Sequence, residues 1–435
     1  MPPTDHGKNG CDNSTECDAS RPQHTGSCTW CNGDLHSGGR PDHRGWNNTY
    51  YADTAIATDA LGRLALATAP NQSLPWFLAV GFRDPHLPWR YPGRFGEAYP
   101  ARVPSTNRSQ IPTDTPPMAW QYPLYFNGNY GNFWELDSAE HMQLTDEEVA
   151  EGTRAYYATI SFTDSEIGRV LDAARATGGW DDMLVVLWSD HGQNVGEHAT
   201  WCKMAVWEHS LRVALLIKPP STGPQAVPPS AFAGQTYRSP VELLDLYKTM
   251  AELAGLSAPQ KGVEGDSLVA AFRAPTVSIK PFAISQTTRC HLDREGMSGH
   301  QWVEPETAAK FYAACVRVQR DSFGYMGYSL RTVGYRYTGW FAWLNVTSTG
   351  GPGPDLASGP AGEELYDHRN DTAHFDVDNF EYVNLVHDDA FASTAQELRE
   401  LLIKTVGSWQ TPAAVKMDDD EASPAAPQLS YVSWG

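Results

Sequence analysis

The residues best suited to chemistry lie in one stretch, residues 183–203, which reads MLVVLWSDHGQNVGEHATWCK. Its apolar beginning ends abruptly at Asp190 and His191, and Lys203 follows twelve residues after His191. Open α/β sheets bind their ligands beyond the carboxyl ends of the strands. A carboxylate and an imidazole at such an end could hold a metal ion, and a lysine could bind a doubly charged oxyanion. The stretch therefore predicts a site for a metal ion and an anion.

Gly192 directly follows the Asp190–His191 pair and is expected to let the backbone turn sharply beyond the strand. Glu197 and His198 come next, and they could either orient ligands or lie on a solvated loop. An isolated Asp-His-Gly sequence also occurs in ordinary turns. The whole stretch is much more specific, because the value of a motif rises with its context.

Strand and helix patterns alternate along the first part of the chain. Short apolar runs predict strands over residues 76–82, 183–188 and 213–217. Apolar residues recur at helical spacing over residues 53–68, 145–177 and 240–255. This alternation predicts an α/β fold with a mainly parallel sheet flanked by helices. His86 follows the first predicted strand, in a loop bounded by prolines.

After about residue 275 the pattern changes. A strand is predicted over residues 282–285, a hairpin over residues 327–340 and a helix over residues 395–406. We therefore predict three parts. Residues 1–275 form an incomplete α/β domain, and residues 276–410 form a smaller carboxy-terminal α+β subdomain with an antiparallel sheet. Residues 411–435 form an acidic, mobile tail. Residues 1–48 of the first part form a cysteine-containing loop segment in this prediction.

The composition argues against several classes of protein. The 435 residues are 41% hydrophobic, which allows a packed core and excludes disorder throughout. The net charge of −20 argues against nucleic-acid binding, because proteins of that class are usually basic. No apolar run approaches the roughly 18 residues of a membrane-spanning helix. Because the protein as a whole is acidic, an anionic substrate must be captured by a local cationic pocket.

Cysteines and glycosylation sequons bear on the compartment in which the protein works. Four of the seven cysteines lie within the first 31 residues, where they could form disulfides or ligate a zinc ion. Six Asn-x-Ser/Thr sequons favour a secretory protein, and they begin at Asn13, Asn47, Asn71, Asn107, Asn345 and Asn370. The first residues carry neither the basic nor the apolar region of a signal peptide.

Several segments share their order and spacing with one protein family. They are the stretch 183–203, residues 77–92 with FLAVGF, PHLP and YP, and residues 156–169, 208–213, 326–332 and 364–367. Together they resemble the sulfatase branch of the alkaline-phosphatase superfamily, and within it the iduronate-2-sulfatase subfamily. The resemblance implies a sulfatase fold and a calcium-dependent sulfuric ester hydrolase. It further implies removal of sulfate from uronate units of sulfated glycans, in the lysosome or outside the cell.

The resemblance assigns roles to four residues. Asp190 matches a calcium-ligating aspartate and His191 the adjoining metal-site position. Lys203 matches a lysine that binds the sulfate, and His86 a histidine that faces the sulfate or the leaving group. Cleavage of a sulfate ester needs charge stabilisation on the nonbridging oxygens and a proton for the leaving alcohol. Lys203 and His86 are therefore the expected catalytic and substrate-binding residues.

The nucleophile of the family is a cysteine in a Cys-x-Pro/Ala-x-Arg motif, oxidised to formylglycine. Residues 17–21 (CDASR) match it formally, but Pro22 follows at once and no helix-forming run comes after it. Cys17 fits better as a disulfide cysteine. The family's metal-binding Asp-Asp pair also has no counterpart at the end of a predicted strand. We therefore expect an incomplete catalytic domain that binds calcium poorly and does not turn over a sulfate ester.

Two other functions are compatible with the sequence. A phosphoryl hydrolase of the same superfamily would share the Asp-His-Gly motif, although the carboxy-terminal segments favour a sulfatase. A non-catalytic protein could instead bind sulfated glycans through Lys203, Arg83 and Arg90. In each case the expected partner is an anionic ester, a sulfated glycan above all, and neither nucleic acid nor a membrane.

Overall fold

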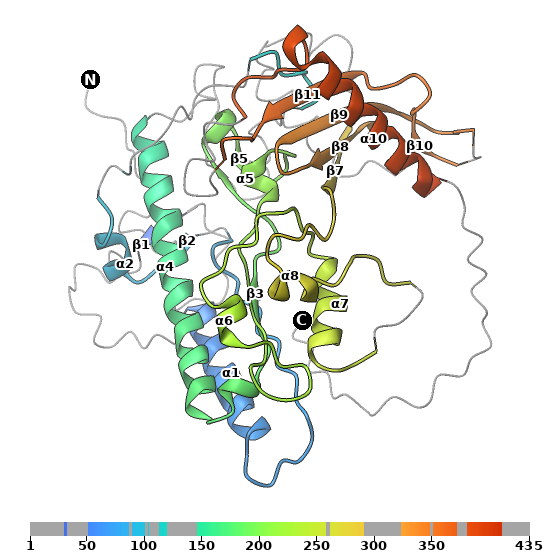
Figure 1. The fold of residues 1–435 in the computed structure, drawn as a ribbon. Helices are drawn as coiled ribbons and strands as arrows, with labels where there is room; N and C mark the ends of the chain where they lie inside the picture. The colour runs from blue at the N-terminus through green and yellow to red at the C-terminus, as the bar shows by residue number, and fades with distance from the viewer. Residues whose placement is uncertain are drawn as a thin grey trace, which may run out of the picture.

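In chain order, most helices belong to a first group of elements that precedes residue 275, and most strand residues belong to a second group that follows it (Figure 1). The computed structural model describes residues 30–32, 51–86, 89–100, 103, 113–119, 146–257, 262–290, 323–348, 351–371 and 381–410. The helices of the first group are α1 (Ala52–Ala67), α2 (Gly93–Glu97), α4 (Asp146–Ala176), α5 (Glu208–Leu211), α6 (Pro229–Phe232), α7 (Asp245–Leu253) and α8 (Val269–Arg273). Its strands are β1 (Trp30–Asn32), β2 (Trp89–Tyr91), β3 (Val185–Trp188), β4 (Asn194–Val195), β5 (Trp201–Cys202) and β6 (Leu215–Lys218).

The long helix α4 organises this group, and α1 lies beside it (Figure 1). Both helices confirm the predictions from helical spacing. Small residues of α4, Ala155 and Ala158, are fully or almost fully buried and let neighbouring segments approach closely. Phe162 of α4 packs with Trp89 and Trp201 in the same core. Burial of each large side chain contributes about 1.5–3 kcal/mol, so this core fixes the segments around it.

Strand β3, which leads to Asp190, pairs with β6 in the antiparallel direction, with Val186 opposite Ile217. Parallel strands need a crossover that returns the chain to the starting end of the sheet. The connection over residues 189–214 contains the short strands β4 and β5 and the four-residue helix α5, but no long crossover helix, and β6 begins at the end where β3 stops. This pair therefore differs from the mainly parallel sheet expected. Among the described strands, only β1 and β2 pair in parallel.

Residues 76–82 form no strand, so that prediction is wrong. No described strand pairs with them, and Phe77 is 80% exposed. An apolar run becomes a strand only where neighbouring backbone satisfies its hydrogen bonds, and periodicity does not report on that neighbour. The segment leads directly into the turn that carries His86.

The second group forms an antiparallel sheet covered by one long helix (Figure 1). Its strands are β7 (Ala283–Cys290), β8 (Phe323–Arg331), β9 (Tyr335–Leu344), β10 (Gly353–Pro354) and β11 (Gly362–Asp367), and its helix is α10 (Ala392–Gln410). The predicted hairpin is confirmed, because β8 and β9 pair up to Arg331 opposite Arg336. Leu398 and Leu402 of α10 are buried against the sheet. The chain thus has the predicted α/β fold with a carboxy-terminal antiparallel sheet.

The predicted boundary at residue 275 falls between α8 and β7, and it stays a prediction. Polar contacts cross this point. The ammonium group of Lys280 lies 2.6 Å from Glu242 Oε2 and 2.6 Å from Asp245 Oδ1. The predicted tail over residues 411–435, and residues 1–48 apart from β1, lie outside the described residues. None of the described helices is long and apolar enough to span a bilayer.

Candidate functional site

Asp190 and His191 lie side by side at the carboxyl end of β3. His191 Nδ1 lies 2.7 Å from the carbonyl oxygen of Gly192. A carbonyl can only accept, so Nδ1 carries the proton and Nε2 presents its lone pair in the neutral ring. Nε2 lies 3.4 Å from Asp190 Oδ2, and the Asp190 side chain is 82% exposed. Two atoms that can donate a lone pair therefore lie next to one another, on one exposed and one half-buried side chain.

The backbone beyond this pair is fixed by close packing against α5. The amide of Gly192 donates to the carbonyl of Ser210 over 2.9 Å. A Cβ atom at Gly192 would collide with the carbonyl oxygen of His209 and lie 2.8 Å from that of Arg212. Gly192 does not have a positive φ, so close backbone approach and not turn geometry requires glycine here.

Replacing Gly192 with alanine is expected to lower the free energy of unfolding by about 3 kcal/mol, because backbone atoms must move to admit the methyl group. Chemical denaturation followed by circular dichroism would measure this. Gly168→Ala is the matched control, since nothing lies within 4 Å of a Cβ at that position in α4. In the control, the free energy of unfolding should rise by about 0.5–1 kcal/mol, because alanine is more stable than glycine inside a helix. Equal stability of the two variants would contradict the packing argument.

Lys203 is half-buried and directly follows the small hairpin of β4 and β5. Within this hairpin the Glu197 carboxylate accepts a hydrogen bond from the amide of Val195 over 2.6 Å. His198 is buried between the rings of Trp207 and Tyr382, each centred 4.6 Å from its own. The solvated-loop interpretation of Glu197 and His198 is therefore wrong. Glu197 therefore restrains the hairpin that precedes Lys203, and His198 packs against aromatic rings outside it.

His86 lies at the exposed end of the turn over residues 83–86. The indole of Trp89 donates to the carbonyl of Pro85 over 2.8 Å. The same indole packs against Trp201, with ring centres 6.4 Å apart, and Trp201 stands two residues before Lys203. An aromatic contact thus links the segment after His86 to the hairpin that precedes Lys203.

Asp84, in the same turn, is a titratable group with an unusual environment. Burial raises the pKa of its carboxyl to about 8, and the nearby Asp53 carboxylate adds to the effect. The folded protein therefore keeps a proton on Asp84 at neutral pH, whereas the unfolded chain loses it near pH 4. Stability from this group is present below the unfolded pKa and falls as the pH rises towards the folded pKa.

The free energy of unfolding should therefore fall by about 3–4 kcal/mol between pH 5 and pH 8 because of Asp84. Asp84→Asn resembles the protonated carboxyl and should remove this part of the slope. Urea denaturation of both proteins at several pH values would test it. Identical pH slopes in the two proteins would show that Asp84 titrates normally in the folded state.

A buried ion network anchors the segment after Lys203 to the carboxy-terminal sheet. Arg336 of β9 is 2% exposed and bonds both Glu208 of α5 and Glu381. Glu381 also accepts from the amide of Glu208 over 2.6 Å, and His368 Nε2 lies 3.0 Å from Glu381 Oε1. Burial alone would raise the pKa of Glu208, but the guanidinium groups of Arg336 and Arg331 outweigh it and lower that pKa.

Within the described part of the chain, Glu208, His368 and Glu381 also form the one group of three side chains close enough to hold a metal ion. The Arg336 guanidinium already occupies this position, because it bonds one oxygen of each carboxylate. A metal ion there would meet a fixed positive charge. The group is therefore structural. The sequence alone did not predict this ion network. Its one signal was Arg336 within the aromatic strand β9, because a buried arginine requires a buried carboxylate as partner.

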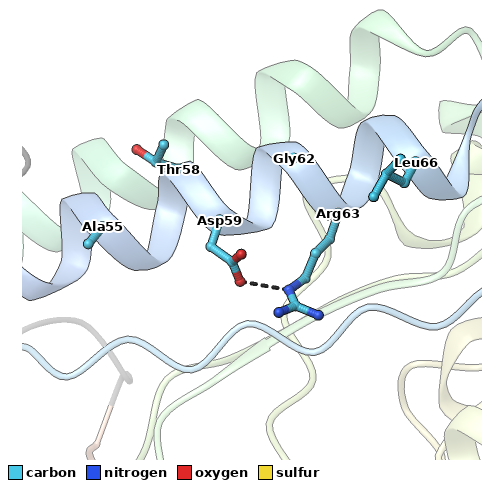
Figure 2. Close-up of a pocket in the computed structure, with 6 residues that line it drawn as sticks. All are labelled: Ala55, Thr58, Asp59, Gly62, Arg63 and Leu66. Atoms are coloured by element: carbon cyan, nitrogen blue, oxygen red, sulfur yellow. Dashed lines mark hydrogen bonds and ion pairs between the residues drawn. The ribbon is translucent and has the colours of Figure 1, made fainter. Parts of the chain in front are cut away.

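A hollow on the outer face of α1 contains none of the predicted site residues (Figure 2). Its lining residues all come from that helix and are Ala55, Thr58, Asp59, Gly62, Arg63 and Leu66. Its two charges neutralise one another, since Arg63 Nε bonds Asp59 Oδ2 over 2.6 Å. The hollow offers no unpaired charge for catalysis.

Comparisons with known proteins agree on one family. A family model described as Sulfatase matches residues 9–256. A protein named sulfatase from Formosa agariphila is 27% identical over 344 residues, which are 78% of this chain and 52% of the relative. Iduronate 2-sulfatase from Mus musculus is 27% identical over 311 residues, which are 61% of this chain and 52% of the relative. The chain therefore spans about half the length of these curated relatives.

One solved structure illustrates the likeness in fold. The phosphonate monoester hydrolase from Silicibacter pomeroyi superposes with a TM-score of 0.56 at 19% identity. The superposition covers 85% of this chain and 64% of the hydrolase. At this identity the likeness describes the fold, and it confirms the α/β fold class predicted from the sequence.

Proposed function

The chain belongs to the sulfatase family, and from this we propose that it carries a sulfate-ester site. Lys203 and His86 are its proposed sulfate contacts, and Asp190 and His191 are two of its proposed metal ligands. Hydrolysis of a sulfuric ester is the reaction class proposed for such a site once a nucleophile completes it. The proposal rests on the family match together with the geometry at the end of β3.

The observation that carries the proposal is the spacing of the Asp190–His191 pair. Ca²⁺ binds oxygen ligands at about 2.3–2.6 Å, so two ligands at right angles around it lie about 3.3–3.7 Å apart. The Asp190 Oδ2 and His191 Nε2 atoms are separated by 3.4 Å. The Gly192 carbonyl fixes the tautomer of His191 that leaves Nε2 free to donate its lone pair. One oxygen and one nitrogen atom could thus ligate the same cation, and the family resemblance makes calcium dependence part of the proposal.

A calcium ion requires about 6–8 ligand atoms, so this pair cannot complete a coordination sphere. Among the described side chains, Asp190 and His191 belong to no larger group of potential metal ligands. When bound, the ion would neutralise charge on the sulfate oxygens. Weak calcium affinity is the expected property of these 435 residues.

Lys203 and His86 supply the remaining chemistry of the proposed site. Lys203 is half-buried, and a partly desolvated lysine is a stronger partner for a sulfate oxygen than a fully exposed one, because less water competes for it. His86 is exposed on its turn, where an imidazole can reach a sulfate oxygen or give a proton to the leaving alcohol. The two residues would therefore hold the sulfate group from two different segments.

The proposed substrate is a sulfated uronate unit of a glycan. Support comes from the resemblance of the carboxy-terminal segments and from relatives that are named iduronate 2-sulfatase. Six glycosylation sequons support a lysosomal or secreted protein. No credible formylglycine cysteine stands within the sequence, so we propose that these 435 residues bind the ester without hydrolysing it.

Calorimetric titration with a heparin disaccharide that carries a 2-O-sulfated uronate tests this function, with the desulfated disaccharide as control. Calcium is present in both titrations, and sulfate release is measured in parallel. We expect binding of the sulfated form at least ten-fold tighter than the desulfated form, and no release of sulfate. Equal affinities would contradict the sulfate site. Sustained sulfate release would instead contradict the loss of turnover.

A further inference from the structure

The turn that carries His86 is held by a residue far away in the sequence. Asp53, in the first turn of α1, accepts the amide of Arg83 over 2.7 Å at one carboxylate oxygen. It accepts the amide of Asp84 over 3.2 Å at the other oxygen. The hydroxyl of Thr163 in α4 donates to the second oxygen over 3.1 Å. Both oxygens of a fully buried carboxylate are therefore used to hold one turn.

Hydrogen bonds and an ion pair among neighbouring residues of α1 and α4 hold Asp53 in its position. Thr54, the next residue of α1, donates to Glu166 of α4 over 3.1 Å, and Arg169 forms an ion pair with the same carboxylate. Thr54, Glu166 and Asp53 are all buried between the two helices. Buried polar groups are costly unless they are satisfied, so a network of this kind defines one relative position of α1 and α4.

The same turn is also held at its other end. The amide of His86 donates to the carbonyl of Arg83 over 3.0 Å, which closes the turn on itself. The indole of Trp89 donates to the carbonyl of Pro85 over 2.8 Å. Backbone groups of residues 83–86 are thus restrained, while His86 itself remains exposed. A restrained backbone with an exposed imidazole suits a side chain that must meet a ligand in one orientation.

We propose that Asp53 is a positioning residue, which fixes the turn over residues 83–86 so that the His86 imidazole faces the sulfate group. This inference rests on the proposed function, because His86 is a sulfate contact only within that proposal. Asp53 does not touch the ligand. It acts through two backbone amides, and a carboxylate is required because an amide side chain would turn its own NH₂ group towards one of these donors.

Hydrogen–deuterium exchange and affinity together test the role of Asp53. The variants are Asp53→Asn, His86→Ala and the double variant, with Asp59→Asn as the matched control on the exposed face of the same helix. Exchange is followed in peptides covering the turn and, as reference, in peptides of β8. Affinity is measured by calorimetry with the 2-O-sulfated heparin disaccharide. Thr163→Val is a milder variant, which removes one donor to Asp53 and keeps the backbone contacts.

We expect Asp53→Asn to raise the amide exchange rate of the turn at least ten-fold and to leave the exchange rate of β8 unchanged. Thr163→Val should raise the exchange rate of the turn by a smaller factor. Asp53→Asn and His86→Ala should each weaken binding about ten-fold. The double variant should bind no more weakly than His86→Ala alone, and Asp59→Asn should resemble the wild type.

Unchanged exchange in Asp53→Asn would overturn the positioning role while leaving the sulfate site intact. Fully additive losses of affinity would also overturn it, because Asp53 would then act independently of His86. If His86→Ala binds the disaccharide normally, the proposed function fails, and the role of Asp53 in it fails as well, whatever the exchange shows.

Discussion

Replacing Arg336 with methionine is expected to lower the free energy of unfolding by about 3–5 kcal/mol, the range observed when one partner of a buried ion pair is removed. Arg336 is 2% exposed and neutralises two carboxylates, those of Glu208 and Glu381. Methionine fills much of the same volume, so the effect reports on the lost charge more than on a cavity. The two acids would remain buried, close together and without their shared cation.

The consequences should extend to the candidate site. Glu208 begins α5, and the carbonyl of Ser210 in α5 accepts the amide of Gly192 next to His191. Loss of Arg336 is therefore expected to loosen the segment between Asp190 and Lys203 as well as the sheet. Urea denaturation would measure the change in stability. Exchange in peptides covering residues 189–212 would report on the site.

Arg369→Met is the matched control for this prediction. Arg369 also pairs with an acid, Asp367 at the end of β11, but its side chain is 56% exposed. Exposed pairs contribute about 0–1 kcal/mol, so the control should change stability little. If Arg336→Met and Arg369→Met lower the free energy of unfolding equally, the buried ion network does not join α5 to the carboxy-terminal sheet.

Replacing Lys203 with alanine is expected to weaken binding of the 2-O-sulfated disaccharide by about 10- to 100-fold. Hydrogen bonds to charged groups contribute about 1.5–3 kcal/mol, and each 1.4 kcal/mol corresponds to a tenfold change in Kd. The net charge of −20 strengthens this expectation, because the rest of the protein surface repels an anion on average.

Lys404→Ala serves as the control, because Lys404 is an exposed lysine of α10 and the substitution removes the same charge. Calorimetric titration would compare the three proteins, and circular dichroism would verify that each is folded. The control should bind as the wild type does. Equal weakening by both substitutions would mean that general charge, and not Lys203 itself, attracts the ligand.

The sequence predicted features that depend on local spacing. Apolar residues at helical intervals predicted α1, α4 and α10, and a Gly-containing turn between alternating residues predicted the β8–β9 hairpin. The apolar run that ends at Asp190 likewise predicted β3. In each case the signal lies within one element, where periodicity follows directly from backbone geometry.

Features that depend on distant partners were not predictable. Residues 76–82 have the composition of a strand, but whether they form one depends on a hydrogen-bonding neighbour. The direction of β6 depends on the path of the chain between residues 189 and 214. Some contacts form only in the folded protein, such as those of Arg336 with Glu381 and of Asp53 with Arg83. No spacing in the sequence predicts such pairs.

A double-mutant cycle on Lys203 and His86 tests the central claim most directly, namely that both residues bind one sulfate group. Affinities of the wild type, Lys203→Ala, His86→Ala and the double variant would be measured for the sulfated disaccharide and its desulfated counterpart. We predict that each single substitution weakens only binding of the sulfated form, and that the double variant loses less than the sum of the two. Additive losses, or equal losses for the desulfated sugar, would show that the two residues do not share a sulfate.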